Sequence, residues 1–99
     1  MPHRVRLTAR AKRDIADIRS YFASDDKRAA ERVRQQILHA ISLLADYPLI
    51  GTASDEAQVR VKLVRHYPYR IYYRVMGDVI EILHVRHTAR KEPDPQDLT

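Results

Sequence analysis

The sequence predicts a single α+β domain with the element order β-α-α-β-β-β, in which an antiparallel sheet carries a two-helix hairpin packed on one face. Three observations lead to this fold class. Residues 58–87 contain three strand-like runs in which apolar and aromatic side chains alternate with Arg and Lys. Two stretches before them repeat apolar residues at helical spacing, after a short alternating run. The 99 residues suit one pair of layers around one core.

The N-terminal half predicts a short strand and two helices. Residues 3–7 alternate between basic and apolar side chains, as a half-buried strand does, and Thr8 suits a helix N-cap. The apolar stripe of the first helix consists of Ala11, Ile15, Ile18 and Phe22. A second helix is expected over Lys27–Asp46, and Pro48 ends it. Its apolar stripe consists of Ala30, Val33, Ile37, Ile41 and Leu44.

The C-terminal half predicts a three-stranded meander. Its first strand covers residues 59–63, and residues 66–68 form a turn. In the next strand, one side carries Ile71, Tyr73 and Val75, and the other carries Arg70, Tyr72 and Arg74. After a tight turn at residues 76–78, the last strand runs to residue 87 with apolar residues on both faces. It is either a central strand covered on both sides or a strand with a bulge near Ile82 and Leu83.

Positive charge is concentrated in this meander. The whole chain has a formal net charge of +5, and residues 58–91 carry eight Lys and Arg against two Asp and Glu. We expect one folded domain over residues 1–91, followed by a flexible acidic tail over residues 92–99. A cationic sheet favours an anionic partner, either nucleic acid or an acidic protein segment. The alternative is that these charges only keep an exposed sheet face soluble.

Several classes of chemistry are excluded by the residues at hand. The chain has no cysteine for thiol or disulfide chemistry, and its two glycines cannot form a phosphate-binding loop. His84 and His87 are three residues apart on a strand, so they point to opposite faces, and we expect no metal or other cofactor. No stretch approaches the roughly 20 apolar residues of a membrane span, so we expect a cytoplasmic protein without a membrane partner.

The remaining candidates form a basic cluster that could cleave RNA without a metal. Such a reaction needs a base, cations that stabilise the developing phosphorane charge, and an acid. The candidate residues are Arg60, Lys62, Arg70, Arg74, Arg86 and Arg90, with Tyr72, His84 and His87 close by. The alternative is that the histidines are hydrogen-bonded structural residues and that the tyrosines belong to the core.

The chain resembles the RelE/ParE superfamily of toxins from type II toxin–antitoxin modules. The resemblance rests on the order and spacing of several short pieces rather than on any one of them. These pieces are Leu7-Thr8, Ala11, Asp14-Ile15, Tyr47-Pro48, Gly51, the run from Tyr69 to Val75, the run from Ile80 to His87, and Arg90. The resemblance implies a compact toxin and a co-produced antitoxin, whose often acidic segment folds as it wraps the toxin. The antitoxin usually carries the DNA-binding element.

The superfamily divides by target, and the end of this chain looks ParE-like. RelE-like members are ribosome-dependent mRNA endonucleases, whereas ParE-like members poison DNA gyrase and are not nucleases. After Arg90 only Lys91 is basic, and no tyrosine follows. We therefore expect a gyrase-directed toxin that is not an enzyme. Its expected partner-binding residues are Arg60, Lys62, Arg70, Tyr72, Arg74, Arg86 and Arg90.

Two alternatives stay open. The first is a RelE-like endonuclease that acts on mRNA in the ribosome, with Lys62, Arg70, Arg74, His87 and Arg90 as the candidate catalytic residues. The second is an inactive or retargeted basic binding module.

Overall fold

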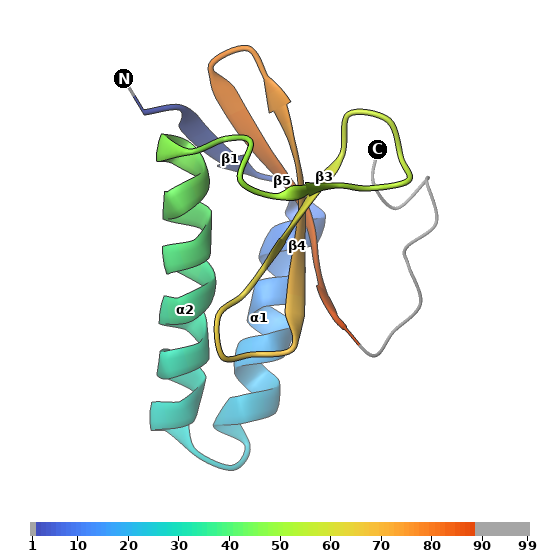
Figure 1. Cartoon of the computed structure of the whole chain (residues 1–99). Coiled ribbons are helices and arrows are strands. Elements are labelled where there is room, and N and C mark those ends of the chain that lie inside the picture. The colour runs from blue at the N-terminus through green and yellow to red at the C-terminus, as the bar shows by residue number, and fades with distance from the viewer. Residues whose placement is uncertain (1, 89–99) are drawn as a thin grey trace.

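A computed structural model of the chain describes residues 2–88 (Figure 1). The elements are β1 (Arg4–Leu7), α1 (Ala9–Ala23), α2 (Lys27–Asp46), β2 (Thr52–Ala53), β3 (Arg60–Leu63), β4 (Tyr69–Met76) and β5 (Val79–His87). This is the predicted α+β order, with β2 as a two-residue addition between α2 and β3. Arg90 and the predicted tail over residues 92–99 lie outside the described residues.

The five strands form one sheet in the order β1-β5-β4-β3-β2. The meander is antiparallel as predicted, but β1 pairs in parallel with β5, from Arg4 opposite Val79 to Leu7 opposite Ile82. The sheet is therefore mixed, and this one pair differs from the antiparallel sheet that the sequence predicts. Alternation along a four-residue edge strand is the same for both orientations, so the pattern carries no information on direction.

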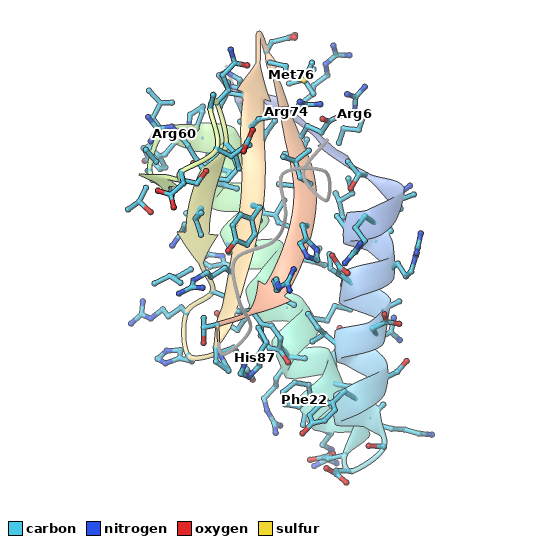
Figure 2. All side chains as sticks on the ribbon, turned by 90° about the vertical axis from the view of Figure 1, so that its right-hand side faces the viewer. Arg6, Phe22, Arg60, Arg74, Met76 and His87 are labelled. Carbon is cyan, nitrogen blue, oxygen red and sulfur yellow. The ribbon has the colours of Figure 1, made fainter. Side chains whose placement is uncertain are left out.

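Helix α1 begins directly after the predicted cap Thr8, and α2 begins at the predicted residue Lys27. The Thr8 side chain accepts a hydrogen bond from the Ala11 N–H, and the Asp26 side chain accepts one from the Arg28 N–H. All five residues of the predicted α2 stripe are buried. On α1, Ala11 is buried and the rest of the stripe packs against the core as partly buried side chains. Figure 2 views the sheet from the side opposite α2. In this view α2 lies behind the sheet, and α1 lies beside β5.

β5 combines the two possibilities that its sequence leaves open. It lies between β1 and β4, and a bulge interrupts its pairing, because Tyr72 lies opposite His84 while Tyr73 lies opposite Ile82. Leu83 is the extra residue. The bulge keeps Ile80, Ile82 and Val85 together in the core under the helices, whereas Leu83 packs with Tyr72 on the other surface. We call that surface, which is turned away from α1 and α2, the far face.

No helix within residues 2–88 is long and apolar enough to cross a membrane.

Candidate functional site

The strand register divides the predicted cations between two sides of the sheet. Residues directly opposite each other in an antiparallel pair share a face. Arg60 lies opposite Tyr73 and Lys62 lies opposite Ile71, and both partners belong to the core under the helices. Arg60 and Lys62 therefore lie on the helix side, whereas Arg70, Tyr72 and Arg74 lie on the far face. The prediction that these basic residues form one cluster is therefore wrong for Arg60 and Lys62.

The reason lies in β3, whose alternating pattern fixes which residues share a face but not which face meets the helices. Val59 and Val61 pack with Tyr72 and Leu83 in a small second cluster on the far face. The apolar side chains of β3 pack in this cluster, and the basic side chains of β3 therefore lie on the side of the sheet that faces the helices. Figure 2 shows Arg74 near Arg6, with Arg60 apart from both.

Arg60 holds the loop that follows α2. Its Nη1 donates hydrogen bonds to the carbonyl oxygens of Gly51 at 2.7 Å and of Leu49 at 3.4 Å. The Tyr73 hydroxyl donates to the Pro48 carbonyl at 2.7 Å and accepts from the Gly51 N–H at 3.0 Å. Burial raises the pKa of Tyr73 above its usual 10.0, although the Gly51 N–H and Arg60 act in the opposite direction. These contacts give Arg60 a structural task.

The loop also requires a glycine at position 51. A Cβ atom there would lie 2.6 Å from the Tyr73 hydroxyl oxygen and 2.8 Å from the Val61 carbonyl oxygen. Both distances are too short for a side chain. The same close approach lets Tyr73 reach the backbone of the loop.

Arg74 is engaged by a buried carboxylate. Its Nε and Nη2 lie 2.8 and 2.7 Å from Oε1 of Glu81, and Arg6 binds the other carboxylate oxygen. Burial acts to raise the pKa of Glu81, but the hydrogen bonds from Arg74 and Arg6 outweigh it, and the pKa lies below the usual 4.5. Arg74 is therefore a partner in an ion-pair cluster at the β1 end of the far face. A single Glu in an apolar strand is the sequence signal that points to this cluster.

His84 is bound to a carboxylate from α1. Its Nδ1 contacts Oδ2 of Asp14, the same oxygen accepts from the Val85 N–H at 3.0 Å, and Arg10 Nε donates to Oδ1 at 3.2 Å. Burial acts to raise the pKa of Asp14, but these hydrogen bonds outweigh it, and the pKa lies below the usual 3.8. Asp14 thus occupies the edge of β5 beyond the end of β1. His84 is 3% exposed, which favours its structural interpretation.

A groove of about 940 Å³ runs between α1 and the C-terminal end of β5. Arg13, Asp14, Tyr21 and Phe22 line it from α1, and Arg86 and His87 line it from β5. The His87 ring packs edge-on against the ring of Tyr69, with centroids 5.5 Å apart. Figure 2 shows Phe22 and His87 near each other at this end of the molecule.

The predicted residues gather only in part. Arg70 and Arg86 lie directly opposite each other at the end of the β4–β5 pair, and Tyr69 lies opposite His87 in the same pair. Tyr72 is 1% exposed, so it belongs to the core of the far face. Sequence reasoning missed Arg6, Arg10, Arg13 and Asp14, which face the meander from β1 and α1. Within residues 2–88, no three His, Asp or Glu side chains are grouped so that they could hold a metal ion.

Comparison with known proteins identifies related chains. The family described as ParE toxin of type II toxin–antitoxin system, parDE, matches residues 5–92. Toxin Y4kP of Sinorhizobium fredii is 39% identical over 90 residues, which are 91% of this chain and 93% of the relative. Toxin RelE2 of Caulobacter vibrioides is 36% identical over 83 residues, which are 84% of this chain and 92% of the relative.

A solved structure shows the same fold. The chromosomal ParDE toxin–antitoxin system of P. aeruginosa contains a chain that superposes with a TM-score of 0.78 at 22% identity, covering 86% of this chain and 95% of that one. The family match spans nearly all of the described residues, and two relatives above 30% identity carry the name of toxin. The chain therefore belongs to the ParE toxin family of type II toxin–antitoxin systems, within the RelE/ParE superfamily that its sequence resembles.

Proposed function

We propose that this toxin arrests growth by acting on DNA gyrase and that a co-produced antitoxin neutralises it. The family match to ParE toxins supports the target, because ParE-like members of the superfamily poison gyrase. The structural relative belongs to a ParDE toxin–antitoxin system, which supports an antitoxin partner. In this proposal the toxin acts by binding and is not a nuclease.

The observation that carries the choice of target is the division of the basic residues by the strand register. Metal-free RNA cleavage needs a base, an acid and a cationic clamp within reach of one phosphate. Lys62 lies on the helix side and Arg70 on the far face, while Arg74 is bound to Glu81. His84 is bound to Asp14. The nuclease set expected from the sequence is thus not gathered among the described residues, and this favours gyrase.

The ribosome-dependent endonuclease is the second candidate, and two observations favour it. One relative is named toxin RelE2. The end of the β4–β5 pair also places Arg70 and Arg86 directly opposite each other on the far face, and these two guanidinium groups could bind a phosphate.

Two assays on one preparation of the purified toxin distinguish these candidates. The first measures DNA supercoiling and DNA cleavage by gyrase without ribosomes, and the second measures mRNA cleavage in the ribosomal A site. We expect loss of supercoiling or trapped cleaved DNA in the first assay and intact mRNA in the second. Cleaved mRNA that depends on Arg70, tested with Arg70→Ala, together with unaffected gyrase, would reverse the assignment.

The toxin–antitoxin part of the proposal is tested by growth. Expression of this chain alone should arrest growth, and co-expression of the neighbouring reading frame should relieve the arrest. The Leu44→Asp variant is the matched control, because an unpaired charge in the core should unfold the toxin and abolish its effect. Unimpaired growth with soluble, folded wild-type protein would contradict the proposal.

A further inference from the structure

The far face carries an apolar cluster that is too well buried for an open sheet surface. Tyr72 is 1% exposed and Leu83 is 3% exposed, although both pack on the side of the sheet that is turned away from α1 and α2. An antiparallel sheet can leave one face to water, and the side chains on that face are then mostly polar. Burial of a large aromatic ring to this degree indicates a covering layer, and neither helix provides it.

Arginine side chains border this cluster along the length of the face. Arg70 and Arg86 lie directly opposite each other at one end of the β4–β5 pair. Towards the other end, Arg74 and Arg6 share the carboxylate of Glu81, so two positive charges meet one negative charge. Like charges at such positions repel each other, and an anionic group placed near them relieves the repulsion. A layer that combines acidic with apolar side chains therefore suits this face.

The chain leaves the sheet at the Arg70 end of this face. Thr88 donates its N–H to the Pro68 carbonyl at 2.8 Å, directly before the first strand residues of β4. Residues 89–99 follow, and a fully extended chain of this length spans about 36 Å. β4 is eight residues long, which corresponds to about 26 Å. The segment is therefore long enough to return along the whole far face.

The composition of this segment matches the face that it can reach. Residues 92–99 contain no Lys or Arg, and their acidic residues are Glu92, Asp94 and Asp97. Pro93 and Pro95 separate these acidic residues and favour an extended chain, which can lie on a sheet face through its side chains. Covalent attachment to β5 also gives the segment an effective concentration in the millimolar range, which favours it over a free anion of equal charge.

We propose that residues 89–99 dock on the far face of their own chain, with the three acidic side chains against the arginines of that face. Leu98 then lies against the apolar cluster. The docked segment supplies the covering layer, and it shields the arginines from other anions, nucleic acid included. This contact gives the tail a bound position in place of the flexible one that its composition alone favours. It goes beyond the proposed function, because it holds for either target.

The position of the segment can be measured directly, because the chain has no cysteine. Gln96→Cys introduces one thiol into the tail without changing its charge, and a nitroxide spin label is coupled to it. The label broadens the NMR signals of nearby methyl groups. We expect strong broadening for Leu63, which lies opposite Arg70 on the far face and is 58% exposed. Leu38, which lies on α2 and is 38% exposed, should be broadened weakly.

Two substitutions on neighbouring strands test the charge contact. Arg70→Gln removes a cation from the far face and should reduce the broadening of Leu63 several-fold. Lys62→Gln removes the same charge from the helix side and should leave the broadening unchanged. High salt should act as Arg70→Gln does, because it screens exposed charges. A mixture of spin-labelled chains with isotope-labelled, cysteine-free chains should show no broadening, since the contact lies within one chain.

The shielding is measured with fluorescent oligothymidylate as the anionic probe. The tail variant combines Glu92→Gln, Asp94→Asn and Asp97→Asn. The control variant combines Asp25→Asn, Glu31→Gln and Asp46→Asn, which remove the same three charges from exposed positions of the helical hairpin. The two variants have the same net charge. The tail variant should bind oligothymidylate on the order of tenfold more tightly than the control, as expected for the loss of about three surface ion pairs.

Several results would overturn the proposal. These are equal broadening of Leu63 and Leu38, no broadening of either, or equal effects of Arg70→Gln and Lys62→Gln. Broadening in the mixture would place the segment on a second copy of the chain, and equal oligothymidylate binding by the two triple variants would show that the far face is not shielded. If Arg70→Gln unfolds, the salt series and the triple variants decide. The measurements need neither gyrase nor ribosomes, so a failure of the proposed function is recognised separately.

Discussion

At the scale of single residues, Tyr73 joins the sheet to the loop after α2. Its hydroxyl bonds to Pro48 and Gly51, which lie more than twenty positions earlier in the chain, and Arg60 closes the same contact. The position of a basic residue in an alternating strand suggests a surface role for Arg60. The structure instead gives it backbone carbonyls to bind, because the loop passes over the helix side of β3.

Removing the Tyr73 hydroxyl should destabilise the fold measurably. Tyr73→Phe leaves the buried Gly51 N–H and the Pro48 carbonyl without their partner, and we expect a loss of about 1–3 kcal/mol in the free energy of unfolding. Urea denaturation followed by circular dichroism measures it. Tyr47→Phe, at a side chain that is 60% exposed, is the control and should change the free energy by no more than about 0.5 kcal/mol. Equal urea midpoints for the two variants would show that the hydrogen bonds of the Tyr73 hydroxyl do not stabilise the loop.

Asp14 and Glu81 should make the toxin sensitive to acid. Both have pKa values lowered in the folded state from 3.8 and 4.5, so their stabilisation is present above these values and is lost as the pH falls through the folded pKa. Denaturation measured at a series of pH values below neutrality should show this loss. In Asp14→Asn, the free energy of unfolding should fall less steeply as the pH is lowered. In Asp55→Asn, at an exposed position, it should depend on pH as in the wild type. If Asp14→Asn showed the same pH dependence of unfolding as the wild type, the stabilising role of the Asp14 carboxylate would be contradicted.

At the scale of elements, α1 and β5 depend on each other. Thr8 caps α1 by accepting from the Ala11 N–H, and the same hydroxyl donates to the Leu83 carbonyl at 3.0 Å. Asp14, which follows later in α1, accepts from the Val85 N–H. One helix therefore covers the part of the β5 edge that β1 is too short to reach.

Thr8→Ala should reduce stability by about 1–2 kcal/mol, because it removes the cap of α1 and a donor to β5 at once. Thermal or chemical unfolding checks this value. Ser24→Ala is the matched control, since the Ser24 hydroxyl donates to the Tyr21 carbonyl at an exposed helix end. A Thr8→Ala variant as stable as Ser24→Ala would mean that the link between α1 and β5 carries no stability.

At the scale of the whole molecule, one core lies between the sheet and the two helices, and a smaller cluster lies on the far face. The buried stripe of α2 packs in the main core. Leu44→Asp places an unpaired charge where the wild-type side chain is 0% exposed, and its cost should be of the order of the whole stability of a small domain, roughly 5–15 kcal/mol. We expect this variant to be unfolded by circular dichroism.

Leu38→Asp is the matched control on the same helix, at a position that is 38% exposed. It should remain folded with a melting temperature near that of the wild type. A folded Leu44→Asp variant, or an unfolded Leu38→Asp variant, would contradict the position of α2 on the sheet.

The elements that sequence predicts best are those with a clear period. The α2 stripe repeats at helical spacing from Ala30 to Leu44, and each of its five predicted positions is buried. The face of β3 was not predictable in this way, because Val59 and Val61 have a second small cluster to join. The contact between Asp14 and His84 was also missed, since seventy positions separate them and only the fold brings them together. An acidic residue next to the helical stripe is the weak signal that points to it.

The pairing of β1 with β5 joins the two ends of the described chain, and this has a consequence for the newborn protein. β1 pairs with β5, and the Thr8 hydroxyl that caps α1 donates to the Leu83 carbonyl of the same strand. Contacts this distant in sequence form late, because the entropy cost of closing a long loop comes before the stabilisation that the contacts provide. The sheet therefore cannot be completed until β5 has been synthesised. A chain whose synthesis stops before β5 would leave both β1 and the hydroxyl of Thr8 without their partners on that strand.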